Sequence, residues 1–251
     1  MSGHSKWANI KRRKAAVDAQ KGKLFSKLAR EITVAARQGG PNPDANVRLK
    51  AAIEKARSFN MPLENIQRAI SRGQGTQEEG EFEEITYEGY GPGGVAILLE
   101  VWTDNRNRTA GEIRHIFSKR GGTLGESGSV AWMFERKAEV RVRANREDEE
   151  RLLEALLDVE AEDVRAEEGG FVVLGRPEAL QTISEAVRRA GFVVEEAELV
   201  REPKIRTEVH GEEAERLLSL LEALEDHDDV RAVYANFEMS EQEVVKALGE
   251  E

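Results

Sequence analysis

The sequence of 251 residues lacks cysteine altogether and has only four histidines. Without cysteine the chain cannot form disulfides, thiol nucleophiles or cysteine zinc sites. The histidines are widely separated, and none occurs in the HxH or HExxH spacing of a metal site. Long apolar runs are also missing, because the longest strongly apolar run is Val95–Leu99 and the N-terminus has no secretory core. These absences predict a cytoplasmic protein that holds no metal and does not bind a membrane.

Motifs for catalysis and for cofactor binding are missing as well. The glycine-rich segments 73–75 and 91–94 lack the Lys-Ser/Thr of a P-loop and the GxGxxG spacing of a dinucleotide site, so we interpret both as turns. Acidic pairs are too numerous for any one of them to indicate an acid/base dyad. Segment 226–229 (Asp-His-Asp-Asp) could hold a cation, but we favour a solvated turn. We therefore expect no catalytic residue, no cofactor and no small-molecule substrate, hence a protein that is not an enzyme.

Charge is divided unevenly along the chain. The whole sequence has a formal net charge of −11, yet residues 1–75 hold sixteen basic and five acidic residues, a net charge of +11. Residues 76–251 accordingly carry −22. A basic module on an acidic body is typical of a protein that meets a polyanion, because the body repels phosphate and orients the module toward it.

The strongest local signal lies in residues 5–39. Residues 6–14 contain Lys6, Trp7, Lys11, Arg12, Arg13 and Lys14 and no acid. From about Ala19 the spacing predicts a helix, whose apolar side is formed by Phe25, Leu28, Ala29, Ile32, Ala35 and Ala36. Its opposite side gathers Lys23, Lys27, Arg30 and Arg37. A row of cations at this spacing can contact successive phosphates, releasing condensed counterions.

Two further helices complete a predicted helical domain over residues 1–75. Asn42-Pro43 is typical of a helix start, and the second helix is expected to run to about Phe59. The third is expected to follow Pro62 with Leu63, Ile66 and Ile70 directed inward. The polar, acidic segment after residue 73 is interpreted as a hinge.

Beyond the hinge, strand patterns alternate with helix patterns, which predicts an α+β protein. Residues 137–201 show the order β-α-β-β-α-β of a ferredoxin-like domain, whose first helix has the apolar stripe Leu152, Leu153, Leu156 and Leu157. Residues 76–136 and 202–251 each contain half of a second such domain, including a strand expected at 129–134. We predict that these halves form one discontinuous ferredoxin-like domain, with 137–201 inserted between them.

A second basic patch lies in the acidic body. Residues 101–137 have a net charge of +3, and the patch comprises Arg106, Arg108, Arg114, Lys119 and Arg120. The first two lie at a predicted helix start, capped by Asp104 or Asn105, where backbone N–H groups attract anions. Ion pairing with Glu112 and its neighbours is an equally good interpretation. Trp132 and Phe134 could stack on bases, but we expect them in the core.

Three segments resemble the YebC/PmpR family: the opening GHSKWANIKRRKAAVDAQKGKLFSKLAREI, YEGYGPGGVAILLE, and TDNRNRTAGEIRHIFSKRGGTLGESGSVAWMF. The resemblance implies one helical and two α/β domains, a probable transcriptional regulator, and a relation to a mitochondrial translational activator. It implies nucleic-acid binding and supplies no catalytic residue. The positions matching the basic opening are Lys6, Trp7, Lys11, Arg12, Arg13, Lys14, Lys21, Lys23, Lys27 and Arg30.

These observations predict a non-enzymatic nucleic-acid-binding regulator that uses the helical domain as its contact surface. The resemblance favours DNA as the partner, with ribosomal RNA or the ribosome second, because phosphate contacts alone do not distinguish them. Trp7 either stacks on the nucleic acid or packs against its own domain. A different hypothesis is a scaffold whose acidic domains bind a ligand or a protein.

Overall fold

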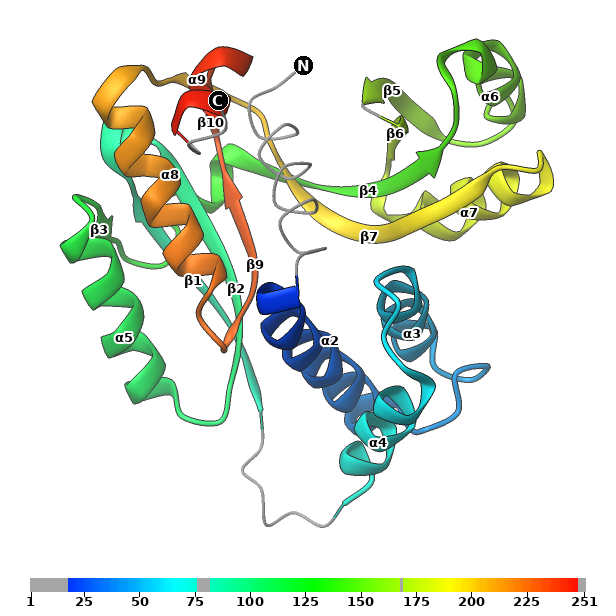
Figure 1. Ribbon diagram of the computed structural model, residues 1–251, viewed down its shortest axis with the longest axis horizontal. Coiled ribbons are helices and arrows are strands. Elements are labelled where there is room, and N and C mark those ends of the chain that lie inside the picture. The colour runs from blue at the N-terminus through cyan, green and yellow to red at the C-terminus, as the bar shows by residue number, and fades with distance from the viewer. Residues whose placement is uncertain (1–17, 76–81, 168, 248–251) are drawn as a thin grey trace. The chain divides into compact units, whose positions relative to one another are not determined.

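The computed structural model describes residues 18–75, 82–167 and 169–247. These residues form two compact units: Leu28–Gly75 with Arg136–Glu202, and the remaining described residues. Helices and largely antiparallel sheets are both present, so the predicted α+β class is confirmed (Figure 1). None of the described helices combines the length and the apolar character that crossing a membrane requires.

Helices α2 (Asp18–Gly39), α3 (Val47–Ser58) and α4 (Leu63–Gly73) form where helical periodicity was expected. The apolar side of α2 is buried, with Leu28, Ile32, Ala35 and Ala36 at most 3 % exposed. In α4 the expected pattern fails at Leu63, which is 56 % exposed, because burial begins only one turn later at Ile66.

Asn46, and not the predicted Asn42, caps α3. Its side-chain oxygen accepts the N–H of Leu49 at 3.0 Å, which satisfies one unpaired donor of the first turn. Its amide nitrogen donates to the carbonyls of Ala35 and Gly40, each at 2.8 Å. Asn46 is therefore buried because one side chain both starts α3 and fixes it to the end of α2.

The first unit contains the sheet β5-β6-β4-β7, formed by β4 (Phe134–Arg143), β5 (Ala161–Glu167), β6 (Gly170–Gly175) and β7 (Val193–Pro203). This is the order second, third, first, fourth for a β-α-β-β-α-β segment. Its core includes Phe171, Val173 and residues of α6 (Glu149–Ala155) and α7 (Leu180–Arg189). The four-leucine stripe predicted for α6 is only half correct, since Leu152 and Leu156 are buried while Leu153 and Leu157 point away.

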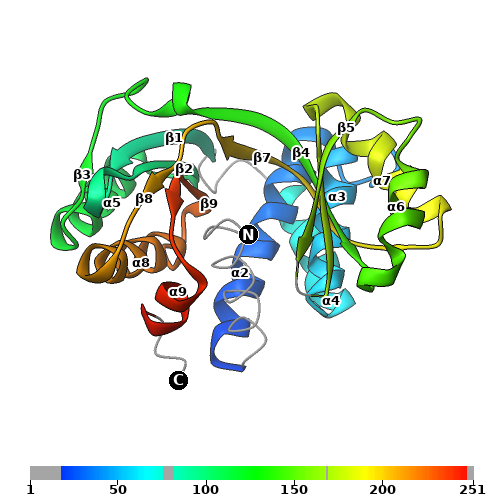
Figure 2. The ribbon, with the colours of Figure 1, turned by 90° about the horizontal axis from the view of Figure 1, so that it is seen from above.

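The second unit contains the sheet β3-β1-β2-β9, formed by β1 (Glu83–Tyr90), β2 (Ala96–Thr103), β3 (Thr123–Leu124) and β9 (Val230–Ala235). The three pairings are antiparallel. Helices α5 (Arg106–Lys119) and α8 (Gly211–Glu225) lie side by side on one face and enclose a core with β2 (Figure 2). Because β2 pairs with β9, this sheet takes strands from before and after residues 137–201.

The C-terminal part of this unit adds a small parallel pair, β8 (Thr207–Glu208) with β10 (Phe237–Glu238), and helix α9 (Glu241–Ala247). Ser240 and Glu243 form a capping box at the start of α9. The Ser240 N–H donates to the Glu243 carboxylate and the Glu243 N–H donates to Ser240 Oγ, both at 3.3 Å.

The strand expected at residues 129–134 is wrong. Ala131–Met133 forms a 3₁₀ turn, and the strand begins only at Phe134. The physical reason is Glu88, a buried residue of β1 whose carboxylate accepts the N–H groups of Gly128, Val130 and Ala131 at 2.7–3.0 Å. These donors are therefore not available to a sheet. Phe134 lies in the core as expected, but Trp132 is 58 % exposed, contrary to expectation.

Charged side chains cluster on one face of the sheet in the first unit. Arg141 pairs with Glu139 at 3.0 Å and also contacts Glu167. Lys55 of α3 lies 2.9 Å from Glu198 and 3.2 Å from Glu196. Burial raises the pKa of Glu139 to about 7; Arg141 opposes the shift, whereas Glu198, Glu196 and Glu167 add to it.

The raised pKa of Glu139 predicts a pH-dependent free energy of unfolding. A glutamate in the unfolded chain titrates near 4.3, so between that pH and about 7 the folded protein binds more protons. Stability should therefore fall as the pH rises through this window, by at most about 4 kcal/mol. Glu139→Gln should flatten the dependence in urea denaturation between pH 5 and 8. Glu195→Gln, at a glutamate of β7, is the control and should keep the wild-type pH dependence. If the free energy of unfolding of Glu139→Gln changes with pH as that of the wild type does, the prediction is wrong.

Candidate nucleic-acid interface

Most of the predicted contact residues lie outside the described part of the chain. Lys6, Trp7, Lys11, Arg12, Arg13 and Lys14 precede residue 18, and for Lys21 the structure describes the backbone but not the side chain. The assignment of these residues to nucleic acid therefore stays a prediction, with its support in the charge of residues 1–75.

The cations on the described part of α2 are partly engaged by the protein. Lys23 is exposed and lies 3.7 Å from Asp226. Lys27 is half-buried and donates to the backbone carbonyls of Glu225, the last residue of α8, and of Val230 at 3.1 Å. A positive charge next to the carbonyl groups at the C-terminal end of a helix is stabilising, because that end carries the negative part of the helix dipole. Lys27 thus connects α2 to the end of α8 inside the second unit. Arg30 and Arg37, on the same helix, are also half-buried.

The second basic patch divides into two kinds of residue. Arg108 pairs with Asp104 at 3.0 Å and with Asp229 at 2.9 Å, and the hydrogen bond to Asp229 raises the pKa of its guanidinium above the ordinary value. Arg106, Arg114, Lys119 and Arg120 form no ion pair with any residue that the structure describes. The ion-pair interpretation thus holds for Arg108, although Glu112 is not its partner, and the other four cations are available to an anion.

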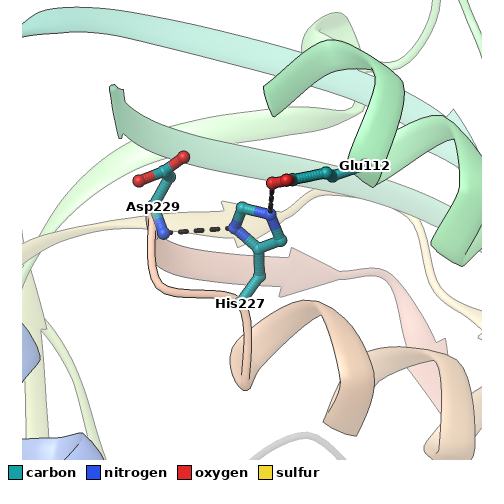
Figure 3. Close-up of side chains that lie close together, drawn as sticks. All are labelled: Glu112, His227 and Asp229. Atoms are coloured by element: carbon teal, nitrogen blue, oxygen red, sulfur yellow. Dashed lines mark hydrogen bonds and ion pairs between the residues drawn. The ribbon is translucent and has the colours of Figure 1, made fainter. Parts of the chain in front are cut away.

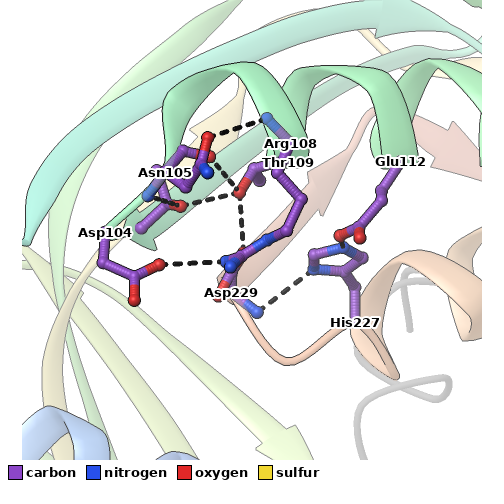
Figure 4. Close-up of polar contacts among 8 residues, drawn as sticks. Asp104, Asn105, Arg108, Thr109, Glu112, His227 and Asp229 are labelled. Carbon is purple, nitrogen blue, oxygen red and sulfur yellow. Dashed lines mark hydrogen bonds and ion pairs between the residues drawn. The ribbon is translucent and has the colours of Figure 1, made fainter.

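A buried polar network surrounds the start of α5 (Figure 4). Asn105 caps the helix by accepting the Arg108 N–H at 3.1 Å. Thr109 Oγ1 donates to Asp229 Oδ2 at 2.7 Å and lies 2.7 Å from Thr103 Oγ1. Asp229 is only 3 % exposed, so the predicted solvated turn at 226–229 is wrong for this residue. The network connects the end of β2, the start of α5 and the turn before β9.

Glu112, His227 and Asp229 bring ligand-type atoms within 4.8 Å of one another (Figure 3). Each of these three side chains already has a hydrogen-bond partner among the described residues. His227 Nδ1 accepts the backbone N–H of Asp229 at 3.1 Å, so in the neutral ring the proton lies on Nε2, 2.8 Å from Glu112. Both ring nitrogens are therefore used, and Asp229 Oδ2 already accepts from Arg108 and Thr109. The group positions the turn between α8 and β9.

Helix α4 presents a polar face that the sequence pattern did not single out. Four residues, Phe59–Pro62, separate it from α3, and Asn60 adopts a left-handed conformation with φ of 59°. A three- or four-residue turn of this kind joins the helices of helix-turn-helix motifs. The exposed residues on one side of α4 are Glu64, Gln67, Arg68, Ser71 and Arg72. The sequence signal for this short connection is Asn60-Met61-Pro62, a turn residue and a proline directly before α4.

Comparison with known proteins gives concordant matches over nearly the whole chain. A family model described as TACO1/YebC protein N-terminal domain matches residues 5–76, and one described as TACO1/YebC second and third domain matches residues 82–237. A Carboxydothermus hydrogenoformans protein is 55% identical over 244 residues, covering 95% of this chain and 99% of its own. A Pelotomaculum thermopropionicum protein is 53% identical over 243 residues, covering 96% and 100%. Both are named probable transcriptional regulatory protein.

A solved structure is similar as well. The crystal structure of a conserved hypothetical protein from Aquifex aeolicus matches with a TM-score of 0.82 and 50% sequence identity. The match covers 89% of this chain and 93% of that one.

The network around Asp229 predicts unequal costs for removing the two partners of Arg108. Asp229→Ala leaves Thr109 and Arg108 without their buried acceptor and should lower the free energy of unfolding by about 2–3 kcal/mol. Asp104→Ala removes an exposed partner on the same guanidinium and should cost less than about 1 kcal/mol. Chemical denaturation measures both. Equal losses would show that burial of Asp229 does not matter.

Proposed function

Because the chain belongs to the TACO1/YebC family, we propose that it is a nucleic-acid-binding regulator of gene expression that acts without catalysis. The observation that carries the proposal is the charge of +11 on residues 1–75 beside −22 on the rest. Cations in that module gain affinity by displacing counterions from phosphates. The acidic remainder repels the same polyanion, which orients the module and limits indiscriminate binding.

We place duplex DNA first as the partner. The relatives are named probable transcriptional regulatory proteins. The face of α4 supports this choice, because Gln67, Arg68 and Arg72 are side chains that can reach base edges in a major groove. Ribosomal RNA offers the same phosphates. Crosslinking in cells, followed by sequencing of both DNA and RNA, distinguishes a transcriptional from a ribosome-linked regulator.

The absence of catalysis is proposed from the way titratable groups are used. The His227 ring has a partner at each nitrogen, and Glu88 accepts three backbone N–H groups. A general base needs an acceptor that can approach a substrate proton. In these clusters the acceptors already serve the fold.

Salt dependence tests the contact surface. If the module engages 6–10 phosphates of duplex DNA, affinity should fall roughly 10³- to 10⁵-fold between 50 and 200 mM salt. Replacing Lys11, Arg12, Arg13 and Lys14 together by glutamine should weaken binding and reduce the log–log salt slope by about 3–4. Fluorescence anisotropy with a labelled duplex measures both quantities.

A matched control changes four exposed arginines outside residues 1–75. The substitutions to glutamine are made at Arg146, Arg176, Arg189 and Arg216. This variant has the same net charge as the module variant and should keep the wild-type slope. If both variants change the slope equally, binding depends on total charge and the module is not the contact surface.

A further inference from the structure

Two large aromatic side chains are exposed next to each other in the second unit. Trp132 is 58 % exposed and Tyr90 is 37 % exposed. The indole Nε1 of Trp132 and the hydroxyl of Tyr90 donate to the same acceptor, the carbonyl of Ser129, at 3.1 and 3.2 Å. The two side chains come from β1 and from the turn before β4, 42 residues apart in sequence.

The exposure of Trp132 does not come from a loose segment. The residues two positions before and after it, Val130 and Phe134, are buried. Glu88 holds the preceding turn through three N–H groups; burial alone would raise the pKa of this carboxyl, but the bonds from Val130, Gly128 and Ala131 lower it below its ordinary value. The Gly125 N–H adds a bond of 2.7 Å to the Glu88 carbonyl. The indole is thus presented to solvent by a fixed backbone.

Cations flank this aromatic surface from two other parts of the chain. The backbone N–H of Lys204 donates to the carbonyl of Met133 at 2.8 Å, so the backbone of Lys204 lies against the residue that follows Trp132. Tyr90 of β1 pairs with Thr123, which follows Lys119, the last residue of α5, by four residues. Both lysines are exposed, and neither forms an ion pair with another residue in the described part of the chain.

We propose that Tyr90 and Trp132 form a stacking site for the unpaired bases of a single-stranded nucleic acid, with Lys204 and Lys119 contacting its phosphates. The site extends the proposed function, on which it rests, by a contact that is separate from residues 1–75. Aromatic faces bind bases of any sequence, since every base has a π-face, and flanking cations follow the backbone. In a duplex the base faces are stacked inside the helix, so the site selects single strands.

Stacking, more than charge, should supply the affinity of this site. Glu126 is exposed in the turn held by Glu88, so the lysines are not in a uniformly positive field. Each stacked base contributes enough that removing one aromatic should weaken binding roughly 5- to 100-fold. The loss should be independent of salt, because no counterion is released by a stacking contact.

The test uses the full chain and a labelled ten-nucleotide strand of mixed sequence, as RNA and as DNA, with the duplex of the same sequence for comparison. Trp132→Ala should lower affinity for the single strand roughly 5- to 100-fold and leave duplex affinity within about twofold. Trp132→Phe, which keeps a π-face, should restore most of it. Leu157→Ala, at an exposed apolar residue of the first unit, should change neither affinity.

A second pair of variants keeps the test valid if Trp132→Ala does not fold. Tyr90→Leu should weaken single-strand binding, whereas Tyr90→Phe should not, because only the hydroxyl is lost. Lys119→Gln with Lys204→Gln should reduce the single-strand salt slope by about 1.4.

Failure of this site and failure of the proposed function give different results. If Trp132→Ala and Tyr90→Leu bind the single strand like wild type, while the variant at Lys11–Lys14 still loses binding, the stacking site is wrong and the regulator stands. If the wild type binds neither strand nor duplex, both are wrong. If Trp132→Ala binds the single strand like wild type but no longer binds a protein that the wild type binds, the stacking site is also wrong.

Discussion

The pairing of β2 with β9 is the constraint on which the second unit depends. Strand β2 is apolar and buried along nearly its whole length, so it needs a hydrogen-bonded strand on each side. One neighbour, β1, is supplied by a tight hairpin, but the other comes more than 120 residues later. Closing this pair brings the turn before β9 to the start of α5. The Asp229 carbonyl then accepts the Trp102 N–H at 2.9 Å while its carboxylate meets Arg108 and Thr109.

Charged residues in this protein serve two different purposes. Arg108, Lys27, Lys55 and Arg141 each contact carboxylates or backbone carbonyls of their own unit. Such contacts hold helices and strands in place. A cation engaged in this way is not available to bind a phosphate. Two of these cations, Lys27 and Lys55, belong to residues 1–75, so part of the positive charge of that module already serves the fold. The proposal of a nucleic-acid partner depends on the surplus that remains on the N-terminal residues.

Local signals in the sequence predicted local structure well. Periodicity located α2, and the start of α5 was narrowed to a cap at Asp104 or Asn105, of which Asn105 is the one, because a cap depends only on residues within one turn. The predictions that failed depend on distant residues. Alternation suggested a strand at 129–134, but the Glu88 carboxylate, about 40 residues earlier, takes its N–H groups.

The candidate sites show the same limit. Cation clustering could be read directly from the sequence, but it did not reveal that Asp229 is buried or that Lys204 bonds to Met133, the residue after Trp132. Those facts follow from strand pairing and from a single backbone hydrogen bond. The domain boundaries at residues 75 and 136, and the roles of the residues before Asp18, stay predictions.

Photocrosslinking of the full chain to bound nucleic acid, mapped by mass spectrometry, tests the central claim most directly. If cations of the N-terminal module make the main contact, crosslinked peptides should come chiefly from residues 1–75. Crosslinks confined to the acidic residues 137–201, with none in 1–75, would contradict the account.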